Sequence, residues 1–304
     1  MLPPKVILVV LNWNKPDDTV ECLESCRQID YDNFEVVIVD NHSADGSAAI
    51  FKKQFPDVYL IENPENIGYA GGNNVGIRWA MERKADYIFL LNNDIVLDRA
   101  VLRELVGFAE SRPEAGMLAP KVMYYDDRAV VNSMGTSMDW LRLRPKLGEC
   151  NRQDRGQYAK PVRKDILVGC SLLLRRGTVE RIGVIDEKFF IFHEAADWCL
   201  RNLKSGSENW TVPSAVIYHK ASKTMREVSA LTLYYSTRNF LYMAHKNANP
   251  WRFFLTRIGL SYLWMKNLAL SAFGNGEKKK MAGIFFLGVR DYFAGQMGKC
   301  QRAF

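Results

Sequence analysis

The first 120 residues alternate short apolar runs with amphipathic segments, and this alternation limits the folds that the chain can adopt. Runs of strand length occupy residues 6–11, 35–40, 58–62 and 87–91, and helical patterns at 19–29, 47–55 and 72–83 separate them. This strand and helix order predicts a parallel sheet with right-handed crossovers. We therefore expect an α/β fold, a mostly parallel Rossmann-like sheet flanked by helices.

Three polar residues directly follow the last of these strands. Residues 87–91 are apolar on both faces, as in a buried parallel sheet, and Asn92, Asn93 and Asp94 continue them. Open α/β sheets bind ligands at the carboxyl ends of their strands, where Asn12 and Asp40 also lie. A carboxylate there can hold a divalent cation, and the cation a diphosphate. The simpler alternative is a turn.

Length and composition are those of a globular protein with one large domain and an appendage, or with two domains. Of 304 residues, 48% are hydrophobic and 25% charged. The sequence passes from Met1 directly into a strand, so we expect no signal peptide. The six cysteines have no metal-ligand spacing, which indicates reduced thiols in a cytosolic protein. We predict a division into domains at 1–225 and 226–304.

The C-terminal region carries the positive charge. Residues 226–304 contain twelve Lys and Arg against three acids, a net +9, so the other 225 residues carry −2 of the chain's +7. Residues 253–273 have about the ~20-residue length of a membrane span, but Arg257 and Lys266 interrupt them. This pattern favours basic amphipathic helices at an anionic membrane surface. The alternative is a helical cap that packs on the domain or forms a homodimer.

Four motifs, in this order, resemble the family-2 glycosyltransferases. They are residues 11–14 (LNWN), 39–46 (VDNHSADG), 65–74 (ENIGYAGGNN) and 91–94 (LNND). The resemblance continues through residues 169–174, 185–201 and 218–220, and is greatest to the rhamnosyltransferase-like branch. It implies the GT-A fold, an inverting reaction and a nucleoside-diphosphate sugar donor, of the UDP or dTDP type. The helical, membrane-interface extension would follow this fold.

The resemblance also implies a donor site. Trp13 would stack on the nucleotide base, and Asp40 would accept a hydrogen bond from the base imide. Gly72 would precede a helix whose N-terminus faces phosphate. The other donor-binding candidates are Asn12, Asn14, Asn66, Gly71, Asn73, Asn92 and Asn93. The structural alternatives are a core tryptophan, a turn-capping aspartate and a tight glycine turn.

Asp94 stands where the family carries its metal-binding acidic motif. The resemblance implies that Asp94 ligates Mg²⁺ or Mn²⁺ on the donor diphosphate, with His219 as a second ligand or diphosphate contact. Asn92 adds no charge but can hydrogen-bond ribose. With one carboxylate, the ion should keep waters and bind mainly together with the nucleotide. A structural histidine is the alternative for His219.

The catalytic motif departs from the family. Inversion needs a carboxylate that takes a proton from the acceptor hydroxyl, and residues 193–201 (HEAADWCLR) carry Ala195 where the family has this acid. Three interpretations follow: Glu194 or Asp197 acts instead, the chain is a non-catalytic relative, or Ala195 is an introduced substitution. We expect Glu194 to be the base and Asp197 to cap the helix or orient the acceptor.

The sequence therefore predicts a metal-assisted inverting glycosyltransferase that acts on a glycan or lipid-linked acceptor. It would lie in the cytoplasm, peripherally bound to the inner face of the cell membrane. A non-catalytic nucleotide-sugar-binding or scaffolding relative is the alternative. A nucleotidyltransferase would show a Gly-rich basic signature after the first strand, in place of Asn12-Trp13-Asn14-Lys15. Nucleic-acid binding is disfavoured, because Phe, Leu and Trp accompany the basic residues of the C-terminal region.

Overall fold

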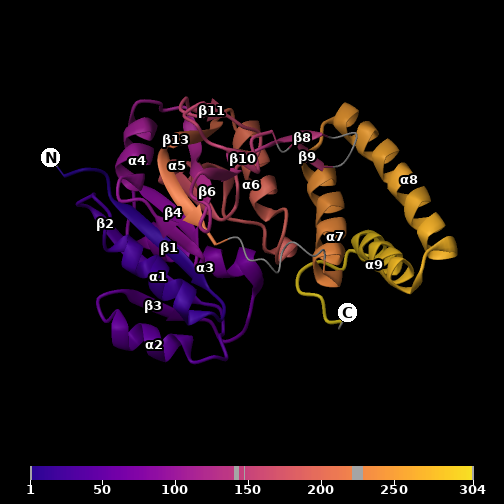
Figure 1. Ribbon diagram of the computed structural model, residues 1–304, viewed down its shortest axis with the longest axis horizontal. Helices are drawn as coiled ribbons and strands as arrows, with labels where there is room; N and C mark the ends of the chain where they lie inside the picture. The colour runs from indigo at the N-terminus through magenta and orange to yellow at the C-terminus, as the bar shows by residue number, and fades with distance from the viewer. Residues whose placement is uncertain (1, 140–143, 147, 221–228, 303–304) are drawn as a thin grey trace.

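A mixed sheet forms the centre of the computed structural model, which describes residues 2–139, 144–146, 148–220 and 229–302 (Figure 1). Four strands are parallel in the order β3-β2-β1-β4, as the sequence predicts. They are β1 (Val6–Asn12), β2 (Phe34–Asp40), β3 (Tyr59–Glu62) and β4 (Tyr87–Asn92). Each end lies within one residue of its predicted position, because continuous apolar runs bounded by polar residues mark buried strands clearly.

The second half of the sheet is mixed. One strand lies antiparallel between β4 and β6, and the last strand pairs in parallel with β6 and antiparallel with β5. These elements are β5 (Ile95–Leu97), β6 (Ala115–Tyr124), β12 (Ser171–Arg175) and β13 (Glu208–His219). The last strand thus brings His219 to the edge of the sheet where β4 ends.

Residues 121–165 contain several short strands. β6 continues to Tyr124. Beyond it lie β7 (Val130–Ser133), β8 (Ser137–Asp139), β9 (Arg144–Lys146), β10 (Arg152–Gln153) and β11 (Val162–Arg163). The strands after β6 have two to four residues, too few to produce a periodic pattern in the sequence.

Helices cover both faces of the sheet, and the side chains of β1 alternate between two apolar cores. Leu8 and Val10 pack with α1, α2 and α4, whereas Ile7 and Val9 pack with α3, α5 and α6. The helices are α1 (Pro16–Cys26), α2 (Ser47–Gln54), α3 (Gly68–Glu82), α4 (Val101–Glu110), α5 (Arg176–Ile182) and α6 (Glu194–Lys204). This layered arrangement confirms the predicted α/β fold.

Helix α3 begins at Gly68, so the prediction that Gly72 precedes the helix is wrong. Gly72 is the fifth helical residue, and a Cβ at this position would lie 2.5 Å from Cδ1 of Leu11. A Cβ at Gly76 would likewise overlap the side chain of Val9. The glycines of α3 therefore allow the helix to pack closely on β1, a demand that sequence does not separate from a turn.

The C-terminal region forms three helices at the end of the molecule far from the N-terminus (Figure 1). They are α7 (Ala230–Asn247), α8 (Pro250–Phe273) and α9 (Gly276–Phe293). Helix α7 packs against α6 and α9, while α8 contacts α9 and α7. The predicted domain boundary between residues 225 and 226 falls outside the described residues, and the two-domain division stays a prediction.

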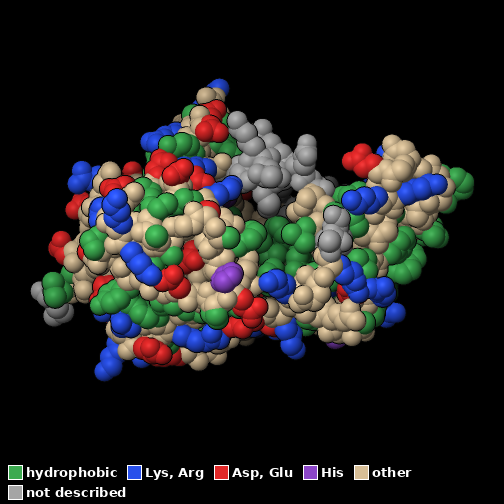
Figure 2. Space-filling model, turned by 90° about the horizontal axis from the view of Figure 1, so that it is seen from below, with side chains coloured by type: hydrophobic (Ala, Val, Ile, Leu, Met, Phe, Trp, Pro, Cys, Tyr) green, Lys and Arg blue, Asp and Glu red, His purple; other side chains and the backbone are tan. Residues whose placement is uncertain are grey.

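Helix α8 exposes a row of large apolar side chains at a spacing of mostly three or four residues. They are Trp251, Phe254, Ile258, Tyr262, Met265 and Leu268, with exposed fractions from 45% to 70%. Figure 2 shows hydrophobic side chains together with Lys and Arg along this helical arm. Within the described ranges, no helix has both the length and the apolar character that crossing a membrane requires.

Candidate active site

The ends of β1 and β2 bring two predicted site residues together. Asn12 and Asp40 are register partners, and Nδ2 of Asn12 donates to Oδ1 of Asp40 at 2.6 Å. Ser43 donates to the same carboxylate through its hydroxyl (2.6 Å) and its backbone amide (3.0 Å). Asp40 is only 3% exposed. A carboxylate has about four lone-pair sites, so these three bonds leave Asp40 able to accept one more from a ligand.

Trp13 lies beside this pair and points to solvent. Its side chain is 56% exposed, so the alternative of a core tryptophan is wrong. Asn14 and Lys15 have positive φ angles of 59° and 58°, which turn the chain sharply after β1. Asn14 stabilises this turn. Its backbone amide donates to Ser43 Oγ at 2.8 Å, and its side-chain Oδ1 accepts from the backbone amide of Ala44 at 3.1 Å. An open indole face next to a buried acid suits a flat base with an N–H group.

Asn93 connects the tip of β4 to this loop. Its Nδ2 donates to Oδ1 of Asn12 (3.2 Å), to Oγ1 of Thr19 (3.0 Å) and to the carbonyl of Asn14 (3.4 Å). Thr19 in turn donates to Oδ1 of Asn12 at 2.6 Å. The side chain of Asn93 therefore fixes the end of β4 relative to the end of β1 and the loop that follows it.

Asp94 and His219 meet at the ends of β4 and β13. Nε2 of His219 lies 3.3 Å from Oδ2 of Asp94, and the Lys220 amide donates to the Asp94 carbonyl at 3.0 Å. Burial alone would raise the pKa of Asp94, but the hydrogen bond and charge of His219 outweigh it, and the pKa is lowered. Asp94 is thus ionised at neutral pH, as a cation ligand must be.

Several buried polar atoms here lack a partner among the described residues. They are Oδ1 of Asp94, Oδ1 of Asn92 and Nδ1 of His219. No group of three or more His, Cys, Asp or Glu side chains in the described ranges is placed to hold a metal. One carboxylate, one imidazole and one amide oxygen fit a divalent cation whose other positions are filled by phosphate oxygens and water.

Hydrogen bonds of Asn66 stabilise the conformation of the segment between β3 and α3. Oδ1 of Asn66 accepts from Nδ2 of Asn41 (3.1 Å) and from the amide of Gly68 (2.9 Å), which shapes the turn into α3. Gly71 lies against Ile67 inside the helix. Asn73 is fully buried and donates to the Tyr69 carbonyl at 2.9 Å. These contacts are structural, and the predicted ligand contacts of Asn66, Gly71 and Asn73 stay predictions.

Glu194 is the first residue of α6 and holds a buried carboxyl group. It is 7% exposed, and its Oε2 has no hydrogen-bond partner in the described part of the chain. Burial raises the pKa of Glu194 to about 7, although the backbone amides of Glu194 and Ala195 act in the opposite direction. A carboxyl that titrates near neutral pH in a buried setting is suited to accept a proton.

Tyr69 and Gly169 form the surroundings of Glu194. The Tyr69 hydroxyl donates to the Gly169 carbonyl at 2.6 Å, and burial together with the charge of Glu194 raises the pKa of Tyr69. A Cβ placed on Gly169 would lie 3.1 Å from Cβ of Ala195 and 3.9 Å from Oε1 of Glu194. Ala195 is 8% exposed and belongs to an apolar cluster, so its methyl group fills the expected position of the base. Tyr69 lies within the motif at residues 65–74, but nothing in the sequence predicts that it lies near Glu194.

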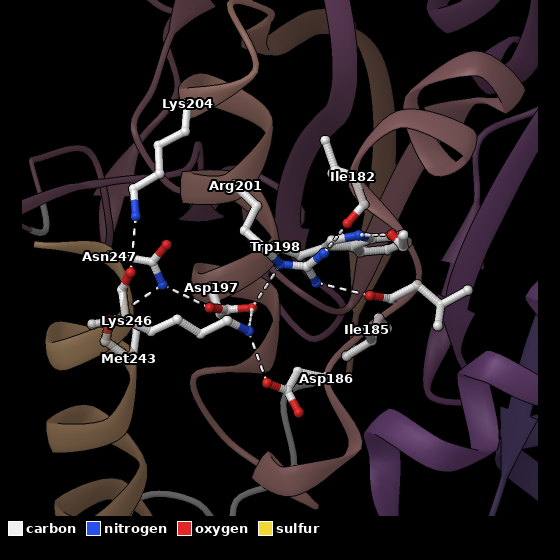
Figure 3. Close-up of polar contacts among 12 residues, drawn as sticks. Ile182, Ile185, Asp186, Asp197, Trp198, Arg201, Lys204, Met243, Lys246 and Asn247 are labelled. Atoms are coloured by element: carbon white, nitrogen blue, oxygen red, sulfur yellow. Dashed lines mark hydrogen bonds and ion pairs between the residues drawn. The ribbon is translucent and has the colours of Figure 1, made fainter.

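Asp197 joins α6 to α7 through its carboxylate (Figure 3). It is fully buried and accepts from Arg201 (2.9 Å), Lys246 (3.0 Å) and Asn247 (2.6 Å). Lys246 also binds Asp186 at 2.7 Å. Because the carboxylate is 0% exposed and both of its oxygens are bonded to these side chains, the structure gives Asp197 a structural role in place of the predicted catalytic or capping one.

The segment that leads to Glu194 is strained and is held by α7. Phe190, Phe192 and His193 have φ angles of 63°, 68° and 68°, in the region that non-glycine residues rarely adopt. Nδ2 of Asn239 donates to three backbone carbonyls of residues 189–192, at 2.7, 2.7 and 3.1 Å. Asn239 therefore positions the entry to α6. In the sequence Asn239 follows three other polar residues, Ser236, Thr237 and Arg238, so no signal sets it apart.

Comparison with known proteins identifies the family. Residues 7–181, more than half of the chain, match the model of glycosyl transferase family 2. A low-salt glycan biosynthesis hexosyltransferase, Agl10 of Haloferax volcanii, is 28% identical over 64% of this chain, which spans 60% of that relative's length. An N-acetylglucosaminyl-diphospho-decaprenol L-rhamnosyltransferase of Mycobacterium tuberculosis is 26% identical over 71% of this chain and 76% of the relative. The dTDP-rhamnosyl transferase RfbF of Shigella flexneri is 23% identical over 81% of both chains.

Solved structures share the fold. Mannosyltransferase PcManGT from Pyrobaculum calidifontis, in complex with GDP-Man and Mn²⁺, has a TM-score of 0.59 at 18% identity and covers 97% of this chain and 89% of its own. GalNAc-T7 with UDP, GalNAc and Mn²⁺ has a TM-score of 0.67 at 14% identity, covering 97% of this chain and 57% of its own. The chain therefore belongs to glycosyl transferase family 2 and is a rhamnosyltransferase-like glycosyltransferase with the GT-A fold.

Proposed function

We propose that this chain is an inverting glycosyltransferase that uses Glu194 as its base. It moves a sugar from a nucleoside-diphosphate donor to a hydroxyl group of a lipid-linked or glycan acceptor. The observation that carries the proposal is the carboxyl group of Glu194. This group is buried, Oε2 has no partner among the described residues, and its pKa of about 7 suits proton transfer at neutral pH.

The donor's nucleotide lies at the ends of β1 and β2. Trp13 offers an exposed ring for stacking, and Asp40 has one lone-pair site left for the N–H of a base. The imide of uracil or thymine presents such a donor, which supports a UDP or dTDP sugar. The Shigella flexneri relative is described as a dTDP-rhamnosyl transferase, and this agrees with the thymine choice.

The donor's diphosphate lies at the ends of β4 and β13, where a divalent cation would bind with it. Asp94 and His219 would hold Mg²⁺ or Mn²⁺, and the amide oxygen of Asn92 faces either the cation or the ribose. When bound, this cation supplies positive charge against the departing nucleoside diphosphate. The two similar structures with Mn²⁺ support the choice of metal.

Glu194 acts on the acceptor. Its carboxylate takes the proton from the acceptor hydroxyl as that oxygen attacks the anomeric carbon from the face opposite the diphosphate. The configuration at this carbon is therefore inverted. At pH 7 the group is about half ionised, because its pKa is about 7. The Tyr69 hydroxyl is held nearby by its bond to the Gly169 carbonyl, and the carboxyl group of Glu194 is itself 7% exposed.

One observation favours a second candidate function. Ala195 places a methyl group where related enzymes carry an acid, which suits a non-catalytic protein that binds nucleotide sugars. The two functions differ in turnover. We would incubate the full chain with dTDP-rhamnose and other sugar nucleotides, Mn²⁺ and a lipid-diphosphate-linked sugar acceptor, and determine the product's anomeric configuration by NMR.

An inverted product would support the enzyme, and Glu194→Gln should then lower turnover by about 10²- to 10⁴-fold. Glu187→Gln, at an exposed acid before the same helix, should leave turnover unchanged. A retained configuration, or full activity of Glu194→Gln, would contradict the proposal. Turnover that appears only in an Ala195→Asp variant would favour the binding protein.

The C-terminal helices are expected to hold the chain on an anionic membrane surface, at the inner face of the cell membrane. The exposed apolar row of α8 lies near basic groups, and Lys278, Lys279 and Lys280 at the start of α9 are also exposed. Flotation with liposomes that contain or lack anionic lipid tests this expectation. A chain that stays at the bottom of the gradient with both, and that sediments as a homodimer, would favour the subunit interface instead.

A further inference from the structure

An apolar groove lies between α7, α8 and α9, next to the segment that leads into the candidate catalytic helix. Its volume is about 340 Å³, within the ~300–1,000 Å³ typical of ligand sites. Helix α7 contributes Ser236, Phe240 and Leu241, and the other two helices contribute Leu263 and Phe285. The inner end of the groove is formed by His193.

The chemistry of the groove selects an uncharged, apolar occupant. Its lining contains no Lys, Arg, Asp or Glu among the described residues. Burial lowers the pKa of His193 to about 4, so the imidazole is neutral at physiological pH. The other polar groups are the hydroxyls of Ser236 and Thr237. A charged ligand would lose its hydration here without gaining a partner, whereas a hydrocarbon chain would bury apolar surface on both sides.

The position of His193 connects the groove to the reaction centre. Its ring packs edge-on against Phe240 with centroids 5.6 Å apart, and it directly precedes Glu194 in the chain. Glu194 does not line the groove, and its Oε1 lies 3.9 Å from a Cβ placed on Gly169. A single peptide link therefore separates a hydrocarbon-binding groove from the proposed base. A molecule that occupies both places must have an apolar tail and a head with a reactive hydroxyl.

Charge around the groove fits the link between such a tail and its head. Helix α8 contributes Leu260 and Leu263 to the groove and exposes Arg257 and Lys266 to solvent. The region from residue 226 onwards carries a net +9. Phosphate groups between an apolar tail and a sugar head would meet this positive potential, while the tail enters the neutral groove.

We infer that the groove between α7, α8 and α9 seats the isoprenoid chain of a polyprenyl-diphosphate-linked acceptor and thereby brings the acceptor sugar to Glu194. The inference rests on the proposed glycosyltransferase function and adds the part of the acceptor that the chain recognises. An acyl chain of a bilayer lipid and a second copy of the protein are the competing occupants.

A groove-filling variant with a matched control tests the inference in the full chain. Ser236→Phe places a ring in the groove at a half-buried position, and Ser261→Phe makes the same change on the exposed surface of α8. Two acceptors carry the same sugar diphosphate, one on a decaprenyl chain and the other on a methyl group. We expect Ser236→Phe to raise KM for the decaprenyl acceptor at least ~10-fold, without changing KM for the methyl acceptor or the donor. Ser261→Phe should change none of these values.

Photolabelling supplies a readout that does not require turnover. A decaprenyl diphosphate with a diazirine near its head should label peptides of α7 and α8 in the wild type and in Ser261→Phe, but not in Ser236→Phe. Labelling elsewhere, equal KM for both acceptors in the wild type, or competition by phospholipid vesicles alone would overturn the inference. So would a changed oligomeric state of Ser236→Phe with unchanged labelling. Labelling of the groove without transfer to either acceptor would refute the proposed function but not the groove.

Discussion

Replacing Glu194 by glutamine should make the protein more stable at alkaline pH while it removes the proposed base. The carboxyl group is 7% exposed, and burial holds its pKa at about 7 in the folded chain. Glutamine has nearly the same shape and cannot ionise. Its amide oxygen can still accept from the backbone amides of residues 194 and 195. The substitution therefore removes a buried charge without opening a cavity.

The sign of the effect follows from proton linkage. The folded pKa of about 7 is above the ordinary value of 4.5, so between these values the folded state binds more protons than the unfolded state. The free energy of unfolding consequently falls as pH rises through this window and levels off above it. The difference of about 2.5 between the pKa values, at ~1.36 kcal/mol per unit, corresponds to about 3 kcal/mol.

Urea unfolding, followed by tryptophan fluorescence, measures this difference. Glu194→Gln should exceed the wild type by about 3 kcal/mol at pH 8.5 and by about 1 kcal/mol at pH 5. Glu187→Gln is the control. The hydrogen bond from Asn74 and the ion pair with Arg78 lower the pKa of Glu187, so its loss should weaken the fold slightly at high pH. A Glu194→Gln variant that is less stable than the wild type at pH 8.5, or equally shifted at both pH values, would refute the reasoning.

Substitutions at three further residues, with Gly107 as a control position, test separate parts of the site and the fold. Trp13→Ala should weaken nucleotide binding by ~1–3 kcal/mol in calorimetry, with almost unchanged stability, because the indole is 56% exposed; a marked loss of stability would mean that Trp13 is a packing residue. Gly72→Ala should destabilise the fold by ~1–3 kcal/mol through its contact with Leu11, whereas Gly107→Ala, which meets open space in α4, should stabilise it by ~0.5–1 kcal/mol. Asn239→Ala should lower kcat with little change in donor affinity and speed hydrogen exchange in residues 189–193, because three carbonyls lose their donor; unchanged exchange would refute that positioning role.

Much of the donor side could be predicted from sequence because its residues lie at strand ends. A strand such as β1 is marked by an uninterrupted apolar run, and the polar residue that follows the run lies at the carboxyl end of the strand. Parallel pairing then brings Asn12 beside Asp40 on one side and places the end of β4 next to the end of β1 on the other. The meeting of Asp94 and His219 does not follow from this pairing. His219 pairs with Ile95 of β5, directly after Asp94, and only the family resemblance pointed to this contact.

The parts that sequence missed depend on contacts between distant segments. Asp197 has the acidic character of a catalytic group, and its structural role becomes visible only when Lys246 and Asn247 approach it from α7. Gly72 lacks a side chain because Leu11 of β1 packs against this position of α3, and not because the backbone makes a turn there. Asn239 binds three carbonyls of a segment with positive φ angles that lies some 50 positions earlier in the chain. None of these leaves a periodic signal.

Calorimetric titration of the folded chain with UDP, dTDP and GDP, each with and without Mn²⁺, tests the central claim most directly. The account predicts that one of these nucleotides binds, that Mn²⁺ strengthens its binding, and that Asp94→Asn abolishes the effect of the metal. If none of the three binds to the folded protein under either condition, the site formed by Trp13, Asp40 and Asp94 is not a donor site and the account is contradicted.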